Sequence, residues 1–307
     1  MIDITHKSST LRTALAQATV KVSKAETIQA INDNAVPKGN VLEIARAAGL
    51  LGIKQTANLI PDCHPMPIEY TGIDYELGEM EIEISVEVKT VYKTGVEVEA
   101  MHAASLVALT LYDMLKPIDK GITIENIRLI KKKGGKSDYA NRYPKGLKAA
   151  VVVCSDSVSA GKKEDKAGQA ILDKLKAFDL EVTAYDIIPD EQETIQAKVK
   201  ALIADGVDLL LFTGGTGLSD RDVTPEAIAP MIERDITGIM EAARKYGQER
   251  MPYAMLSRGV AGTIGKSIVI TMPGSTGGAR ESMDALFPAV LHIFDVLKGF
   301  DHQKKWR

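Results

Sequence analysis

Residues 79–89 alternate strictly between polar and apolar side chains. This pattern predicts an antiparallel strand with one buried face and one face in water. Weaker strand patterns occur near Val20 and over residues 68–77 and 122–130. The order strand, helix, strand, strand, helix, strand predicts a ferredoxin-like α+β sandwich. The two helices of that order are indicated by apolar side chains at helical spacing, namely Val41, Ile44, Ala45, Ala48 and Leu51, and then Ala100, Ala104, Val107, Leu111 and Leu115.

The second half has a different pattern. Residues 149–154 form an unbroken apolar run that is typical of a strand buried on both faces, and further strand patterns follow at 182–188 and 207–212. Helical patterns alternate with these strands, and this alternation predicts an α/β, doubly wound, mostly parallel sheet that binds ligands at the carboxyl ends of its strands. The helical positions are Ile171, Leu175 and Phe178, and then Ile195, Val199 and Leu202.

The boundary between the halves is a stretch that loses its apolar periodicity. From Lys131 to Lys148 the chain collects lysine, glycine, proline and small polar residues, which is the composition of a linker. We therefore expect a first domain at residues 1–138, a linker at 139–147 and a second domain at 148–307. A chain of 307 residues is long enough for two such cores.

Composition narrows the class of protein. A content of 45% hydrophobic and 26% charged residues is typical of a globular protein, and a net charge of −3 with a pI near 6.0 argues against broad binding to nucleic acid. No apolar stretch approaches the length of a membrane span, and the first residues lack a signal-peptide core, so we expect a cytoplasmic protein. Two cysteines, Cys63 and Cys154, make neither a disulfide framework nor a zinc motif.

Residues 213–226 hold the strongest chemical signal in the chain. They follow the apolar run 207–212 and contain Gly214, Gly215 and Gly217, which allow backbone N–H groups to approach a phosphate closely. Thr224 and Pro225 have the residue types of an N-cap and the first helical position. The simpler interpretation is a glycine turn with a surface ion pair. We favour an anion site because a cation and a carboxylate, Arg221 and Asp222, occur in the same loop.

Three other loops follow predicted strands and carry similar chemistry. They are Ser155-Asp156-Ser157, Pro189-Asp190-Glu191 and Pro273-Gly274-Ser275. Because parallel strands end at one edge of a sheet, these loops are expected to line one rim suited to phosphate.

The first half offers weaker signals. His64 lies in a loop stiffened by prolines, Lys38 and Lys54 are cations on flexible stems, and Asp113 and Lys116 have the i, i+3 spacing of a surface ion pair. Glu97 and Glu99 suit either a purine-like N–H edge or the N-terminus of the following helix, and Lys131, Lys132 and Lys133 read most simply as a solvated run. Taken alone, these residues indicate only a site for a polyanion.

Four motifs in order resemble cyclic pyranopterin monophosphate synthase, the MoaC family. They are residues 38–41, 59–65, 94–100 and 111–116, and the similarity runs from about Ile2 to Asp138. The resemblance implies a ferredoxin-like fold, hexamers with active sites between subunits, and conversion of 3′,8-cyclo-7,8-dihydroguanosine triphosphate to cyclic pyranopterin monophosphate with release of pyrophosphate. Asp62 and Asn40 depart from residues that are frequent in the family.

The same resemblance implies roles for individual side chains. Asp113 and Lys116 are the expected acid/base pair, and Lys38 and Lys132 are expected to contact the triphosphate or to transfer protons. The remaining substrate-binding residues implied for this half are Lys54, Cys63, His64, Glu97 and Glu99.

The second half, from about Lys148, resembles the molybdopterin adenylyltransferase family (MogA/MoaB). The resemblance rests on the four loops above and on Leu256-Ser257-Arg258. It implies transfer of AMP from Mg-ATP to molybdopterin, assembly into trimers or larger oligomers, and Asp190 and Asp222 as the residues that organise Mg²⁺ and the reacting phosphate. Substrate binding is implied for Ser155, Asp156, Gly214, Gly215, Thr216, Gly217, Arg221, Ser257, Arg258, Pro273, Gly274 and Ser275.

Together the two resemblances imply a bifunctional enzyme of molybdenum-cofactor synthesis that forms homo-oligomers, with no nucleic-acid or membrane partner. The sulfur-transfer step between the two reactions is absent from the chain. The alternative is that the second half binds pterin or assembles the oligomer without catalysis.

Overall fold

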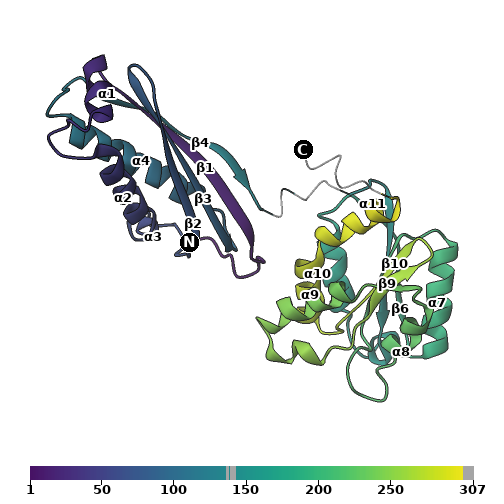
Figure 1. Ribbon diagram of the computed structural model, residues 1–307. Coiled ribbons are helices and arrows are strands. Elements are labelled where there is room, and N and C mark those ends of the chain that lie inside the picture. The colour runs from purple at the N-terminus through teal and green to yellow at the C-terminus, as the bar shows by residue number, and fades with distance from the viewer. Residues whose placement is uncertain (136–137, 139–142, 300–307) are drawn as a thin grey trace. The chain divides into compact units, whose positions relative to one another are not determined.

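The computed structural model describes residues 1–135, 138 and 143–299. Backbone contacts divide the chain into two compact units, Met1–Asp138 and Tyr139–Arg307 (Figure 1). Each unit has its own hydrophobic core.

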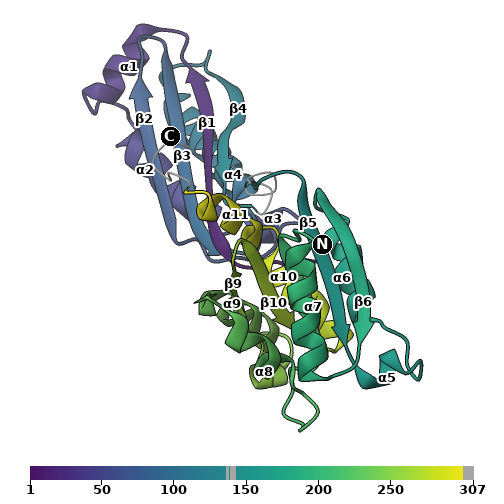
Figure 2. The ribbon, with the colours of Figure 1, turned by 90° about the vertical axis from the view of Figure 1, so that its right-hand side faces the viewer.

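The N-terminal unit is an antiparallel sheet covered on one face by helices. Its sheet has the order β2-β3-β1-β4 with all neighbours antiparallel, and helices α2 and α4 lie along one face (Figures 1 and 2). The strands are β1 (Thr10–Lys21), β2 (Tyr70–Leu77), β3 (Glu81–Tyr92) and β4 (Thr123–Lys133), and the helices are α1 (Ala25–Asn32), α2 (Val41–Ile53), α3 (Thr56–Leu59) and α4 (Glu97–Leu115).

Alternation along the strands produces this two-sided sheet. In β3 the buried positions Ile82, Ile84, Val86 and Val88 face the helices, and the polar positions between them face away. The strand predicted at residues 79–89 is therefore confirmed. Strands predicted near Val20, at 68–77 and at 122–130 are also present.

Helices α2 and α4 pack closely because α2 carries glycines at their contact. A Cβ atom on Gly49 would lie 2.6 Å from Val107, and one on Gly52 would collide with Leu106. Lys38, just before α2, contacts Asp113 in the last turn of α4, so the start of α2 lies beside the end of α4. This antiparallel arrangement brings the segment before α2 to the C-terminal end of α4.

Helix α4 requires a correction to the prediction that no apolar stretch approaches membrane-spanning length. It has 19 residues, and an 18-residue window has a mean hydropathy of 1.2. By length and composition alone, such a helix is long and apolar enough to cross a membrane. Half of that window is buried within the unit, and Ala100, Ala104, Val107 and Leu111 are fully covered. The apolar character of α4 is that of a core helix packed against a sheet.

The C-terminal unit is a six-stranded, mostly parallel sheet between two helical layers. The strand order is β6-β5-β7-β10-β9-β8, in which β6, β5, β7 and β10 are parallel and β9 and β8 form an antiparallel edge. The strands are β5 (Leu147–Cys154), β6 (Leu180–Ile188), β7 (Leu209–Thr213), β8 (Arg234–Asp235), β9 (Ala261–Ile264) and β10 (Ser267–Met272).

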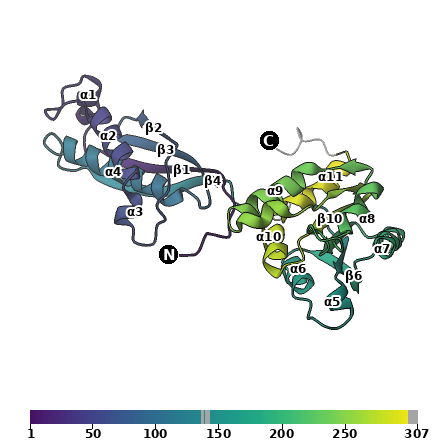
Figure 3. The same ribbon diagram turned by 90° about the horizontal axis from the view of Figure 1, so that it is seen from below.

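Helices cover both faces of this sheet. One face packs on α6 (Ala167–Leu175), α9 (Thr237–Gln248) and α10 (Thr276–Leu286), and the other on α7 (Gln192–Ala204) and α8 (Thr224–Ile228) (Figure 3). Two short helices, α5 (Asp156–Ser159) and α11 (Ile293–Leu297), follow β5 and the last long helix respectively. The predicted mostly parallel α/β sheet is confirmed. The apolar run 149–154 of β5 and the whole of β7 are buried, as their sequences predict.

Three local predictions were wrong. Phe178, expected on a helix with Ile171 and Leu175, lies beyond the end of α6. The lysine run at residues 131–133 belongs to the end of β4, not to a linker, because Leu15, Ala14 and Thr13 of β1 pair with it. Thr224 is the first residue of α8 and not its N-cap; the cap position is Val223, and the Thr224 side chain is buried beneath the glycine loop.

Candidate functional site

The first group of polar side chains lies at the end of α4. Asp113 Oδ2 accepts from Lys38 Nζ at 2.7 Å, and its Oδ1 pairs with Lys116 Nζ at 2.7 Å. Hydrogen bonds from Lys116 and then from Lys38 lower the pKa of Asp113 to about 2. Lys38 also donates to the backbone carbonyl of Asp113 at 2.7 Å, so it binds the C-terminal end of the helix. The cluster is one carboxylate held ionised between two ammonium groups.

The second group lies at the start of α4, around a pocket of about 370 Å³. Cys63 Sγ donates to Glu99 Oε1 at 3.0 Å, and Glu99 is only 2% exposed. Burial, followed by the Glu99 contact, raises the pKa of Cys63 to about 12, so this thiol is protonated and not a nucleophile at neutral pH. Glu97 Oε1 pairs with Lys132 Nζ at 3.1 Å. His64 Nε2 lies 2.8 Å from the carbonyl of Ile2, so Nε2 carries the hydrogen.

The two groups lie at opposite ends of one helix. Glu99 and Asp113 are 14 positions apart in α4, which at the helical rise corresponds to about 21 Å. Within one chain, the Asp113 cluster and the Glu99 pocket therefore do not face a common small substrate. Lys54 caps the C-terminal end of α2 and is exposed; it lines neither group.

A third group lies in the C-terminal unit, at the carboxyl ends of β5, β7 and β10. Four loops meet there around a pocket of about 400 Å³. Of the residues predicted from sequence, those that line this pocket are Ser155, Asp190, Gly214, Gly215, Asp222, Gly274 and Ser275. The rule that parallel sheets bind ligands at their carboxyl edge thus located the pocket.

The glycine loop has the backbone that its sequence predicts. Gly214 and Gly215 have φ values of 99° and 60°, in the left-handed region. A Cβ on Gly214 would collide with the carbonyl of Cys154, and one on Gly215 would collide with Thr224 and lie 2.7 Å from Asp190 Oδ1. The loop therefore presses against the tips of two neighbouring strands, and any larger residue would fill the space in front of Asp190.

Asp190 is the most unusual carboxylate of this pocket. Burial is the largest influence on the pKa of Asp190 and raises it. A hydrogen bond from the Asp156 backbone lowers the pKa, the negative charges of Asp156 and Asp222 raise it, and the net shift is upward. Its Oδ2 accepts from the Asp156 N–H at 3.2 Å, whereas its buried Oδ1 has no hydrogen-bond partner in the described part of the chain. A buried acceptor without a donor fits either a bound proton or a cation.

The carboxylates fit Mg²⁺ bound together with a phosphate. Among the described residues no group of three His, Cys, Asp or Glu side chains is placed to hold a metal ion. Asp190 and Asp222 supply two carboxylates, and Mg²⁺ is commonly held by one or two carboxylates together with water and substrate phosphates. The donor set therefore suits a magnesium ion that arrives with a nucleotide, not a permanently bound one.

Several predicted residues hold the loops instead of lining the pocket. Arg221 pairs with Asp156 Oδ2, at 2.9 Å from its Nε. Arg258 donates to the carbonyls of Gly217 and Asp222 at 2.7 Å each, and it also pairs with Glu226. These contacts fix the glycine loop from behind. Thr216 is buried and its hydroxyl lies 3.5 Å from that of Ser257.

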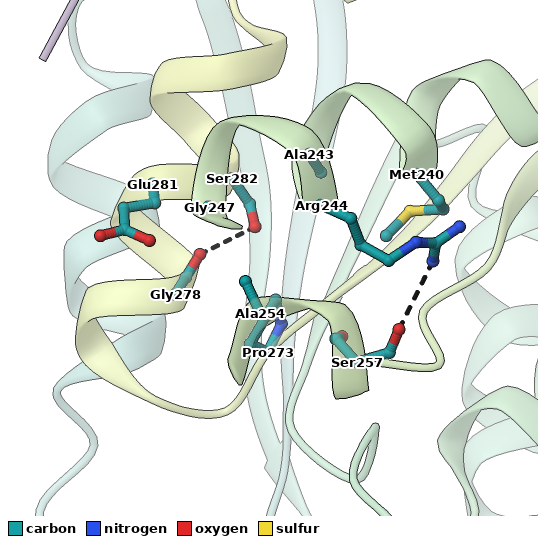
Figure 4. A pocket seen from close by; sticks show the side chains of 10 residues that line it. All are labelled: Met240, Ala243, Arg244, Gly247, Ala254, Ser257, Pro273, Gly278, Glu281 and Ser282. Atoms are coloured by element: carbon teal, nitrogen blue, oxygen red, sulfur yellow. Dashed lines mark hydrogen bonds between the residues drawn. The ribbon is translucent and has the colours of Figure 1, made fainter. Parts of the chain in front are cut away.

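Ser257 and Pro273 line a separate small pocket between α9, α10 and the segment Pro252–Leu256 (Figure 4). Arg244 Nη1, also in the lining, donates to the Ser257 carbonyl at 3.4 Å. The pocket has a volume of about 30 Å³, far below the roughly 300 Å³ that ligand sites usually need. It does not accommodate a nucleotide or a pterin in this conformation.

Comparisons with known proteins agree with the two-unit division. Residues 1–135 match the model of the MoaC family, and residues 150–292 match the family described as "Probable molybdopterin binding domain". A molybdenum cofactor biosynthesis bifunctional protein from Chlorobaculum tepidum is 40% identical over 98% of this chain and 96% of its own length. The chain belongs to this bifunctional family.

Other relatives match one half of this bifunctional chain. A cyclic pyranopterin monophosphate synthase from Clostridium perfringens is 48% identical over 46% of this chain and 90% of its own length. The crystal structure of the molybdopterin biosynthesis enzyme MoaB from Thermus thermophilus is 40% identical, covers 50% of this chain and 97% of its own, and has a TM-score of 0.47.

The structure of this family member also adds residues that the sequence did not point out. Lys7, Ile2 and Ile4 line the pocket beside Glu97 and Glu99, and Lys163 and Lys166 line the pocket beside the glycine loop. Lys163 and Lys166 lie a few residues beyond Ser155-Asp156-Ser157, so following that loop to the start of the next helix would have found them.

Proposed function

We propose that the N-terminal unit is a cyclic pyranopterin monophosphate synthase, which converts 3′,8-cyclo-7,8-dihydroguanosine triphosphate to cyclic pyranopterin monophosphate and pyrophosphate. The observation that carries this proposal is the Lys38–Asp113–Lys116 cluster, in a unit that matches the MoaC family. Ring opening and re-closure require proton transfers, and closing a cyclic phosphate requires neutralised phosphate oxygens.

The cluster offers both kinds of group. Asp113 is ionised at neutral pH, so it accepts protons, while Lys38 and Lys116 carry the positive charge and donate protons. At the other end of α4, Lys132 brings a third cation, beside Glu97. We assign the triphosphate to Lys38 and Lys132, and the pterin portion to His64, Glu97 and Glu99, with Cys63 as a supporting contact.

We further propose that each active site is shared between two chains of a homo-oligomer. The support is the separation of about 21 Å along α4 between Glu99 and Asp113, which exceeds the reach of a single proton-transfer group. An antiparallel or cyclic pairing of subunits brings the end of one α4 to the start of another. The element order and the strand order also support assigning this unit to the ferredoxin-like class.

Turnover of the cyclised substrate tests the synthase. In the full chain, Asp113→Asn removes the only carboxylate of the cluster, and we expect the formation of cyclic pyranopterin monophosphate to fall by more than about a hundredfold. An unchanged rate would overturn the role of this cluster.

We propose that the C-terminal unit transfers AMP from Mg-ATP to molybdopterin. The observation that carries this proposal is the buried Asp190 Oδ1, which faces the glycine loop and has no hydrogen-bond partner among the described residues, with Asp222 in the same pocket. Bound Mg²⁺ would supply charge that neutralises the phosphate oxygens. Residues 215–217 of the glycine loop and the start of α10, capped by Ser275, offer backbone N–H groups to a phosphate, whereas the Gly214 N–H is donated to the Met272 carbonyl at 3.1 Å.

The alternative for this unit is pterin binding or assembly without catalysis. The test is release of pyrophosphate and formation of adenylylated pterin by the full chain, given molybdopterin and Mg-ATP, beside Asp222→Asn. Turnover that is lost in the variant supports the transferase. Binding of molybdopterin without turnover in the natural chain would replace the transferase by a binding module.

The cytoplasm is the location that we propose for both activities. Its support is that Cys63 and Cys154 are both free thiols, as is usual in a reducing compartment.

A further inference from the structure

The loop between α5 and α6 brings two lysines to the nucleotide pocket of the C-terminal unit. Lys163 and Lys166 line this pocket together with Gly214, Gly215 and Thr276. Both are exposed, and in the described part of the chain neither has a salt bridge. The other basic side chain near this rim, Arg221, is paired with Asp156. The two lysines are therefore the cations of the pocket that are available to a ligand.

The backbone of this loop is fixed by Asp165, between the two lysines. Asp165 Oδ1 accepts from the N–H groups of Ala167 and Gly168 at 3.1 and 2.9 Å, which caps the start of α6. Its Oδ2 accepts from the hydroxyl of Tyr185, and burial together with this contact raises the pKa of Tyr185 to about 12. The two lysines thus extend from an anchored backbone, which reduces the entropy lost when they bind a ligand.

The charge of the pocket requires these lysines if the ligand is a polyphosphate. The lining carboxylates are Glu164, Asp165, Asp190 and Asp222, against Lys163 and Lys166. A triphosphate carries about four negative charges and would be repelled by such a rim without cations. Asp190 and Asp222 would hold a metal ion that neutralises part of the phosphate charge, and the lysines lie on the α5–α6 side of the pocket.

We propose that Lys163 and Lys166 bind the β- and γ-phosphates of the nucleoside triphosphate, which leave as pyrophosphate. This inference rests on the proposed adenylyl transfer. In that reaction a phosphate oxygen of the acceptor bonds to the α-phosphorus, the bond from the α-phosphorus to the bridging oxygen breaks, and pyrophosphate departs with the electron pair. Two ammonium groups beside the leaving oxygens stabilise that charge.

The test compares nucleotides that differ only in the number of phosphates. Binding of ATP, ADP, AMP and inorganic pyrophosphate to the full chain with Mg²⁺ is measured by calorimetry for the natural protein, Lys163→Ala, Lys166→Ala and the double variant. Lys162→Ala is the matched control, because Lys162 is an exposed neighbour that does not line the pocket.

We expect each single variant to weaken ATP and pyrophosphate binding about tenfold, and the double variant about a hundredfold, with less than a twofold change for AMP. The control should bind as the natural protein does. An unchanged ATP affinity in the double variant, or an equal loss for ATP and AMP, would overturn the inference and leave the proposed transferase standing. Failure of the natural protein to bind any nucleotide would overturn both.

Discussion

Asp156 and Asp190 exchange hydrogen bonds between backbone and side chain across two neighbouring strands. The Asp156 N–H donates to Asp190 Oδ2 at 3.2 Å, and the Asp190 N–H donates to Asp156 Oδ1 at 3.1 Å. This reciprocal pair joins the loops after β5 and β6. It also fixes the Asp190 carboxyl so that the other oxygen, Oδ1, faces the glycine loop. A carboxyl group whose pKa is raised by burial and by neighbouring negative charges is common at functional sites.

Asp190→Asn should make the C-terminal unit more stable at neutral pH and at the same time abolish its activity. The pKa of Asp190 is raised in the folded state, so the folded unit disfavours the ionised carboxylate more than the unfolded chain does. The variant should therefore unfold at a higher denaturant concentration at neutral pH, and this advantage should shrink as the pH falls through the raised pKa and vanish below the ordinary carboxyl value. Adenylyl transfer should be lost.

Denaturant unfolding between about pH 3 and pH 8 measures this difference. Asp205→Asn is the control, since Asp205 is exposed at the end of α7. Equal stability of Asp190→Asn and the natural protein at neutral pH would show that the carboxylate carries no desolvation cost.

Gly214→Ala should disrupt the glycine loop. Its φ of 99° and the collision of an added Cβ with the carbonyl of Cys154 should together cost about 2 kcal/mol or more. Gly238→Ala, in α9 with open space around the new methyl group, should instead be neutral or stabilising by up to about 1 kcal/mol. Thermal unfolding of both variants gives the comparison, and a Gly214→Ala protein as stable as the natural one would refute the close approach.

Lys116→Met should raise the pKa of Asp113 from about 2 toward the usual carboxyl value, because Lys116 makes the largest contribution to the lowering. In the natural protein the stabilisation from this lowering is present above about pH 4 and is lost as the pH falls through about 2. The carboxyl carbon resonance of Asp113, followed by NMR against pH, reports the shift. Lys120→Met, beyond the end of α4, is expected to leave that titration where it was, and an equal effect of both variants would contradict the pairing.

Mixing two inactive variants should restore synthase activity if sites are shared. Asp113→Asn damages one end of α4 and Glu97→Gln the other, so a mixed oligomer contains some sites with both natural residues. Co-expression should recover about a quarter of the natural rate. Asp113→Asn mixed with Lys116→Ala is the control, since both changes affect the same cluster. No recovery in the test pair would place each site within one chain, and recovery in the control pair would show that mixing restores activity whichever end of α4 is damaged.

Strands and helices with strong periodicity could be predicted from sequence. The alternation at residues 79–89 and the apolar runs at 149–154 and 207–212 each correspond to a strand. The short α1 and α3 and the antiparallel β8 and β9 could not be found this way, because two to eight residues give too few repeats of either period. The lysines at 131–133 were wrongly assigned to a linker because a run of charged residues was interpreted as a loop. They lie on β4, and edge strands often carry lysine.

The candidate sites were predictable only in part, for a geometric reason. Residues at carboxyl ends of parallel strands, such as Asp190 and Gly214, must meet at one edge, and they do. Sequence gives no such rule for Arg258, whose guanidinium turns back to hold the glycine loop, or for Lys163, which reaches the pocket through a loop of irregular backbone. In the other unit, the helical spacing of apolar residues from Ala100 to Leu115 already predicts that Glu99 and Asp113 lie at opposite ends of one helix, and the structure confirms this.

Helix α4 sets both the separation and the relative direction of its two ends. Each residue of an α-helix adds about 1.5 Å of length and about 100° of rotation. One residue inserted between Leu106 and Val107 would therefore turn Asp113 away from its present direction relative to Glu99, whereas the same insertion in a surface loop would alter neither. The middle of this helix holds no candidate catalytic group, yet its residue count determines whether the two ends can serve neighbouring sites.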